Sequence, residues 1–169
     1  LRDVIFASYF GAGSSTDAFF VAFKIPNFFR RLFAEGAFIQ SFVPILNDYK
    51  INRQQDLKKF ISYVQGNLSL ILIIIVSMGI IFSDQVIGTF APGFEHSDKR
   101  FNLSSDMLKI TFPYLFFISL TAMSAGIFNT YDKFLLPSIT PVLLNISLIM
   151  FAIFASSLIQ EPIMSLAYG

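Results

Sequence analysis

Long apolar runs separated by short polar segments dominate the pattern of hydrophobic and polar positions along the chain. Three runs contain no Asp, Glu, Lys or Arg, and they cover residues 60–83, 110–131 and 134–160. Each run reaches the roughly 20 residues that an α-helix needs to cross the hydrocarbon core of a bilayer. Buried helices of soluble proteins are rarely this long and this uniformly apolar. The pattern therefore predicts an all-α fold, a polytopic membrane helical bundle.

The boundaries of the predicted helices follow from the polar segments and turn residues between the runs. The segment 84–106 is the longest polar connection, and Ser104 or Ser105 is the expected N-cap of the helix after it. Proline and glycine at Pro26, Gly36 and Pro44 are expected to bend the longest helix. We predict a single membrane domain over 1–169 with helices at about 1–11 (partial), 16–47, 57–84, 104–130 and 134–159, and a sixth that starts near 162.

Basic residues are distributed unevenly between the polar connections. The connection 48–59 has four Lys and Arg residues, whereas 84–106, nearly twice as long, has two. Loops rich in Lys and Arg stay on the cytoplasmic side of a membrane. This rule predicts that 48–59 is cytoplasmic and 84–106 is outside. Alternation of the spans then places the 129–133 loop at the same side as 48–59.

The predicted helix 16–47 carries charge within a membrane span. On a helical wheel of about 100° per residue, Asp17, Lys24, Asn27, Arg31 and Glu35 share one narrow face, which we call the polar stripe. Arg30 lies about 100° from Arg31 on the same wheel. An ionised side chain at mid-membrane costs roughly 2.5–3.5 kcal/mol even on insertion scales. The stripe therefore needs ion pairs or a water-filled cavity.

Two interpretations of the polar stripe remain open at this point. In the first, buried ion pairs such as Arg31 with Glu35 staple helices together. In the second, the stripe lines a water-filled cavity that binds an anion. Arg2 in the first helix joins the other arginines of this cavity. Adjacent arginines favour the second interpretation because guanidinium forks bind phosphate bidentately. The charges alone do not name a substrate.

Composition excludes several other functional classes. Of the 169 residues 54% are hydrophobic and 14% charged, and the net charge is +1, so no nucleic-acid partner is expected. There is no cysteine, and the single histidine, His96, lies in a polar run. No Walker-type loop, Ser–His–Asp set or metal-spaced acidic cluster is present, so we expect no enzyme, no cofactor and no metal site.

The residues of the second predicted helix and several later segments resemble those of the MurJ (MviN) lipid II flippase family. The resemblance rests on these segments: Gly11-Ala12-Gly13, Thr16 to Lys24, Pro26-Asn27, Arg30 to Phe38, Phe42-Val43-Pro44, Ala91 to Phe94, Lys109 to Tyr114, and Leu143 to Ser147. They extend over nearly the whole chain. The resemblance implies part of the first lobe of a transporter of the multidrug/oligosaccharidyl-lipid/polysaccharide (MOP) exporter superfamily, with two helical lobes around a central cavity.

The resemblance also implies a function, a location and site residues. Lipid II would pass from the cytoplasmic to the periplasmic leaflet of the bacterial inner membrane by alternating access. The expected substrate-binding residues are Arg2, Asp17, Asn27, Arg30, Arg31 and Glu35. The arginines would bind the diphosphate of the lipid, while Asp17 and Glu35 would hold them. The expected partners are lipid II, membrane lipids and a C-terminal lobe of the same chain, because the sequence resembles a fragment.

Three alternatives remain beside this interpretation. A drug/cation antiporter of the MOP superfamily would favour acidic cavity residues over the Arg30–Arg31 pair. A polysaccharide-lipid flippase would share the diphosphate chemistry. A non-transporting membrane scaffold for cell-wall assembly would keep the polar stripe ion-paired and dry.

Overall fold

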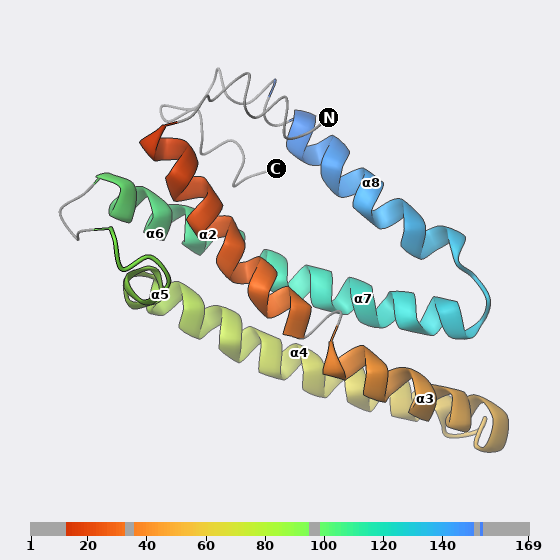
Figure 1. The fold of residues 1–169 in the computed structure, drawn as a ribbon. Coiled ribbons are helices and arrows are strands. Elements are labelled where there is room, and N and C mark those ends of the chain that lie inside the picture. Colours follow the sequence, from red (N-terminus) through yellow and green to blue (C-terminus); the bar gives the residue numbers. More distant parts are fainter. Residues whose placement is uncertain (1–12, 33–35, 95–98, 151–152, 154–169) are drawn as a thin grey trace. The chain divides into compact units, whose positions relative to one another are not determined.

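Seven α-helices make up the described part of the chain. A computed structural model describes residues 13–32, 36–94, 99–150 and 153, in which no strand occurs (Figure 1). The helices are α2 (Ser14–Arg30), α3 (Ala37–Asn52), α4 (Leu57–Ile81), α5 (Ser83–Phe90), α6 (Lys99–Thr111), α7 (Tyr114–Thr130) and α8 (Leu135–Met150). The all-α prediction is confirmed. The predicted helices at 1–11 and from 162 lie outside the described residues.

The prediction of one helix over 16–47 was wrong. α2 continues through Pro26 and ends at Arg30, and α3 begins only after Gly36. Gly36 is the N-cap of α3 with φ −92° and ψ −136°, far from helical values. The glycine therefore interrupts the helix where the sequence pattern indicates only a bend. Pro44, by contrast, lies inside α3.

The predicted helix N-cap at Ser104 or Ser105 was also wrong. The short helix α5 occupies the first part of the connection 84–106, and α6 is already helical from Lys99. Ser104 and Ser105 are buried within α6 because their hydroxyls find partners on other helices. α6 and α7 follow each other with Phe112 and Pro113 between them, where a single helix over 104–130 was expected.

The described residues group into two compact units that alternate along the chain. Unit 1 holds the described residues up to Pro26, Gly79–Phe112, and those from Thr140 onward. Unit 2 holds Asn27–Met78 and Pro113–Ile139. Both predicted cytoplasmic connections, 48–59 and 129–133, fall in unit 2, and the predicted outside connection 84–106 falls in unit 1.

The core of unit 2 forms where α3 packs against α7. Figure 1 draws α3 in orange and α7 in cyan. Gly126 of α7 allows this approach, because a Cβ there would lie 3.4 Å from Val43 and 3.7 Å from both Ile39 and Phe42. Small residues at helix interfaces permit such close packing in membranes. At the end of α3 and the start of α4, the rings of Tyr49 and Phe60 stack with centroids 4.4 Å apart.

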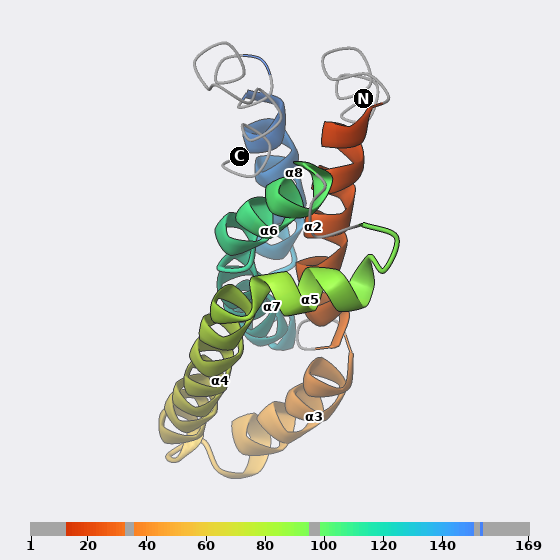
Figure 2. The ribbon, with the colours of Figure 1, turned by 90° about the vertical axis from the view of Figure 1, so that its left-hand side faces the viewer.

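The core of unit 1 forms around α5 and α6, which neighbour each other in Figure 2. Ile87 of α5 is fully buried, as are Met107 and Leu108 of α6. The Ser104 hydroxyl donates to the Ala18 carbonyl oxygen at 3.2 Å and so joins α6 to α2. Phe112 is 2% exposed, and its ring lies against the backbone of Gly79 at the end of α4.

Aliphatic side chains cover the outer faces of α4 and α8. Only 22% of the apolar stretch of α4 is buried, whereas the core helix of a soluble protein is mostly buried. Its exposed aliphatic residues are Leu70, Ile71, Ile73, Ile74, Met78 and Ile81, and those of α8 are Leu135, Ile139, Val142, Leu143, Ile146 and Met150. Soluble monomers rarely expose apolar surface on this scale. Leu57–Ile81 and Lys99–Thr130 are both long and apolar enough to span a bilayer.

Candidate functional site

α2 presents a buried apolar face and an exposed charged face within unit 1. Ala18, Phe19, Ala22 and Ile25 are at most 2% exposed and recur at the three- to four-residue spacing of one helix side. Asp17 and Lys24, two members of the polar stripe, are exposed. Asp17 also lies in the first turn of α2, where its carboxylate faces the positive end of the helix dipole. Packing of the apolar face thus leaves Asp17 and Lys24 outside the core of unit 1.

Asn27 and Arg30 contact each other in unit 2. The Nε–H of Arg30 donates to Oδ1 of Asn27 at 2.7 Å, across one turn of α2. Both residues are half-buried. The bond uses the inner nitrogen of the guanidinium and not the outer Nη pair, which is the fork that binds phosphate bidentately. Asn27 therefore orients Arg30.

Arg31 differs from Arg30 although the two are adjacent. Arg31 is exposed and lies with Leu32 in a π-helical turn that follows α2. Among residues 13–32, 36–94 and 99–150 it forms no ion pair. Its carbonyl oxygen lies beside Gly36, where a Cβ would come within 2.7 Å of it. A side chain at position 36 would therefore displace the backbone at Arg31, between α2 and α3.

The six predicted site residues are only partly described. Asn27 and Arg30 are brought together, Arg31 follows them on the exposed side, and Asp17 lies in unit 1. Arg2 and Glu35 lie outside the described residues, so the predicted pairing of Arg31 with Glu35 stays a prediction. Among the described residues no group of three or more His, Asp or Glu side chains gathers as metal ligands would.

Lys50 makes contacts that the sequence did not reveal. Its ammonium donates to the carbonyl oxygen of Thr130 at 2.6 Å, and it lies 4.7 Å from the ring centroid of Tyr131. These contacts place the 48–59 and 129–133 connections at the same end of unit 2, as the topology prediction required. From the sequence, the Lys and Arg residues of 48–59 indicated only that this connection is cytoplasmic.

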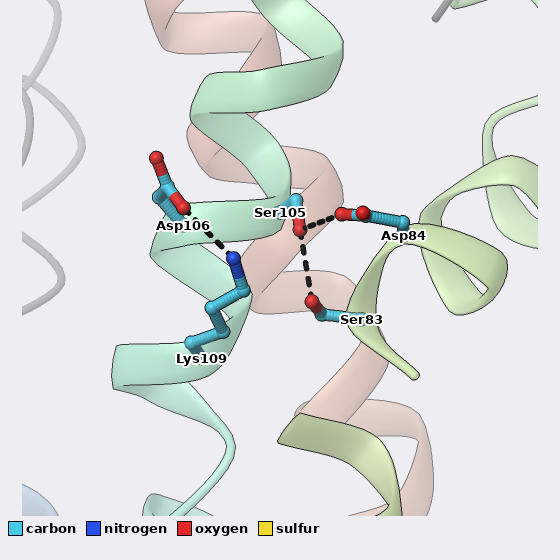
Figure 3. Close-up of polar contacts among 5 residues, drawn as sticks. All are labelled: Ser83, Asp84, Ser105, Asp106 and Lys109. Carbon is cyan, nitrogen blue, oxygen red and sulfur yellow. Dashed lines mark hydrogen bonds and ion pairs between the residues drawn. The ribbon is translucent and has the colours of Figure 1, made fainter. Parts of the chain in front are cut away.

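A second polar cluster joins α5 and α6 in unit 1 (Figure 3). The Oγ of Ser105 lies 2.9 Å from the Oγ of Ser83 and also contacts the Asp84 carboxylate. Because a hydroxyl has one proton and a carboxylate only accepts, Ser105 donates to Asp84 and Ser83 donates to Ser105. One turn away, Lys109 pairs with Asp106 at 3.0 Å on the exposed side of α6. The cluster is internally satisfied and ties the two helices together.

Comparison with known proteins identifies the family. The family model described as "Lipid II flippase MurJ" matches residues 6–169. The chain belongs to the MurJ lipid II flippase family. A MurJ structure, described as the inward closed conformation, superposes with a TM-score of 0.81 at 35% identity, and the match covers 99% of this chain and 35% of that one. The predicted fold, part of a MurJ-like transporter, is therefore confirmed.

Curated MurJ relatives extend the likeness across bacteria. A probable lipid II flippase MurJ of Buchnera aphidicola subsp. Schizaphis graminum is 51% identical over 99% of this chain and 33% of its own length. One from Vibrio cholerae is 43% identical over 100% of this chain and 34% of its own. The lipid II flippase MurJ of Thermosipho africanus is 40% identical over 88% of this chain and 30% of its own. The chain spans about a third of these relatives, and like other MurJ members it is a membrane protein.

Proposed function

We propose that the full-length protein moves lipid II from the cytoplasmic to the periplasmic leaflet of the bacterial inner membrane by alternating access, as a transporter and not an enzyme. The observation that carries this proposal is the match of residues 6–169 to the lipid II flippase family. The structural match to MurJ over 99% of the chain supports it. Lipid II and the remaining lobe of the same protein are the proposed partners.

The diphosphate of the lipid is the group that Arg30 and Arg31 bind in this proposal. Each guanidinium offers a planar fork of donors that matches two phosphate oxygens. Asn27 supports the role of Arg30 because its hydrogen bond to Nε holds the guanidinium in place. Arg31 is exposed, so an anion reaches it without displacing a partner among the described residues. Charge-assisted hydrogen bonds of this kind contribute about 1.5–3 kcal/mol each.

The remaining site residues take supporting roles. Asp17 and Glu35 balance the arginine charge when the cavity is empty, and Arg2 adds a third cation toward the same diphosphate. Transport requires that the lipid binds the inward- and outward-open states with different affinities, since a ligand with equal affinity for both shifts nothing. We therefore propose that these charged residues exchange interaction partners between the inward-open and outward-open states.

Substitution of Arg31 in the full-length protein tests this proposal. Arg31→Ala is expected to lower the appearance of lipid II in the outer leaflet at least about tenfold, because one charged bond is lost. Arg31→Lys retains the charge but not the planar fork of donors, so its flipping activity is expected to lie between those of the wild type and Arg31→Ala. Gln40→Ala, an exposed polar residue of α3, serves as the matched control. Membrane levels of each variant are measured by immunoblot.

The outcome separates the proposal from its alternatives. Full lipid II flipping by Arg31→Ala at normal membrane level would exclude the diphosphate role of Arg31. Transport of a different diphosphate lipid would indicate a polysaccharide-lipid flippase, and transport of organic cations an antiporter. A scaffold would leave a cysteine at position 31 unreactive toward a water-soluble thiol reagent, because its polar stripe is dry.

A further inference from the structure

The end of unit 2 carries three cations that each lie over a tyrosine ring. Lys50 lies over Tyr131 at 4.7 Å, Arg53 over Tyr49 at 5.5 Å and Lys59 over Tyr63 at 5.9 Å from the ring centroids. The pairs come from the end of α3, the start of α4 and the turn after α7. We call these six residues, together with the adjacent Lys58, the cation–tyrosine end.

Contacts between these segments make the cation–tyrosine end a single surface. The bond from Lys50 to the Thr130 carbonyl joins α3 to the end of α7. The stack of Tyr49 on Phe60 joins α3 to α4. Both contacts lie within unit 2, so the three cation–tyrosine pairs lie at one packed end of the same unit. Each pair has at least one exposed member, whereas Tyr49 and Lys50 are half-buried.

The cations of this end keep unused hydrogen-bond donors. Arg53, Lys58 and Lys59 are exposed, and their side chains donate no hydrogen bond to any residue within 13–32, 36–94 and 99–150. Five Lys and Arg residues lie in 48–59 and 131–133 against three aspartates. One of these, Asp48, accepts from Asn52. The end thus presents a net positive field with free N–H groups.

An exposed aliphatic surface of α4 lies next to these hydrogen-bond donors. The exposed aliphatic residues of α4 begin one to two turns after Tyr63 and continue to Ile81. Tyrosine at the boundary of such a surface is typical of the membrane–water interface, where its ring is apolar and its hydroxyl is wet. Lysine and arginine near the membrane–water interface extend their charged groups toward the lipid headgroups. The occupant of the cation–tyrosine end is therefore a lipid headgroup.

We propose that the cation–tyrosine end binds the phosphates of anionic phospholipids and anchors unit 2 at the membrane surface. Anionic headgroups attract each nearby Lys or Arg, and their phosphate oxygens accept the free donors of Arg53, Lys58 and Lys59. The tyrosine rings hold the cations on the headgroup side of α4. This anchoring is separate from the transport site, since it involves none of the residues proposed to bind lipid II.

Lipid selectivity of the full-length protein tests the proposal. The protein is reconstituted in phosphatidylcholine vesicles, and electron spin resonance measures the association of spin-labelled phosphatidylglycerol relative to spin-labelled phosphatidylcholine. The test variant is Arg53→Gln/Lys58→Gln/Lys59→Gln, which leaves Lys50 and its bond to Thr130 in place. The matched control is Lys99→Gln/Arg100→Gln/Lys109→Gln, which removes the same charge from α6 of unit 1.

The expected result is a selectivity for phosphatidylglycerol that falls at least about fivefold in the test variant and falls with added salt. The control variant is expected to keep most of the selectivity. Tyr63→Leu, which keeps every cation, is expected to give a smaller loss. Unchanged selectivity in the test variant, or an equal loss in the control, would overturn the proposal. Lipid II flipping is not the readout, so either proposal can fail without the other.

Discussion

The ammonium of Lys50 lies 2.6 Å from the carbonyl oxygen of Thr130, in the last turn of a helix that ends 80 residues later in the chain. The last carbonyls of a helix have no intrahelical partner. In α7 the amides of Asp132 and Lys133 satisfy the carbonyls of Asn129 and Phe128, the two bonds of a Schellman motif. Lys50 satisfies the carbonyl of Thr130, the residue that follows these two and ends α7. One side chain of α3 thus completes the C-terminal cap of α7.

Removal of this cap is expected to destabilise unit 2. Lys50→Met keeps the aliphatic stem but loses the charged hydrogen bond and the contact with Tyr131, at a cost of about 1–3 kcal/mol. Thermal unfolding of the purified full-length protein measures the change. Lys58→Met is the control, because Lys58 is exposed and loses the same charge without a cap. Equal melting temperatures for the two variants would show that the Lys50 bond contributes nothing.

Asp132 occupies a position that favours glycine. Its φ is 58°, and among the described residues other than glycine it is the one with positive φ. It is the residue of the Schellman motif that adopts the left-handed conformation, where a Cβ is unfavourable. Asp132→Gly is expected to stabilise the protein by up to about 1 kcal/mol and to raise its melting temperature. Lys133→Gly, one residue later, is expected to lower it; the reverse order would refute this explanation.

Gly36 is expected to matter for transport through the backbone of Arg31. Gly36→Ala places a Cβ within 2.7 Å of the Arg31 carbonyl and 3.1 Å of the Leu32 carbonyl, so the turn after α2 must shift. Because Arg31 is the exposed arginine of the proposed site, we expect a loss of lipid II flipping that exceeds the loss of membrane-inserted protein. Flipping per molecule in cells is the measurement.

The control for Gly36 is Gly66→Ala on the exposed surface of α4. A Cβ at Gly66 meets nothing within 4 Å, and alanine favours a helix over glycine by about 1 kcal/mol. Gly66→Ala should therefore retain full activity. If Gly36→Ala retains it too, the close approach to Arg31 has no functional consequence.

Gly79 and Phe112 are expected to be energetically coupled in unit 1. A methyl group at Gly79 overlaps the buried ring of Phe112, so Gly79→Ala should destabilise the protein by about 1–3 kcal/mol. Phe112→Leu removes ring atoms and should restore part of this loss when the two changes are combined. A double-mutant cycle of unfolding free energies measures the coupling. Gly88→Ala, where a Cβ has open space, is the control, and strict additivity of the pair would contradict the predicted overlap.

The sequence predicted features that depend on local pattern. The charge-free run 60–83 predicted α4, which extends from Leu57 to Ile81, because length and uniform apolarity are properties of consecutive residues. The distribution of Lys and Arg predicted that 48–59 and 129–133 share one end, and the Lys50–Thr130 bond confirms it. The adjacent arginines suggested an anion site, which stays a prediction for all six of the residues assigned to it.

The break between α2 and α3 could not be predicted from the sequence. The apolar pattern continues across Gly36, and Pro26, a stronger helix breaker, lies inside α2. In the structure Gly36 adopts non-helical dihedral angles ahead of α3, and a Cβ there would lie 2.7 Å from the Arg31 carbonyl oxygen. Ser104 and Ser105 were misassigned for a related reason. Serine favours helix N-caps locally, but here the hydroxyls find buried partners on α2 and α5.

The sequence by itself determined that the chain is an all-α membrane protein of the MurJ family with arginines on its second helix. Hydrophobic periodicity, charge pattern and sequence motifs are properties of residues close together in the chain, so they can be recognised without knowing any tertiary contact. Only the tertiary structure decided that Asn27 occupies the inner nitrogen of Arg30, that Arg31 stays exposed, and that Lys50 caps α7. These arrangements depend on distances across helix turns and between helices, which side-chain geometry sets and residue order alone does not.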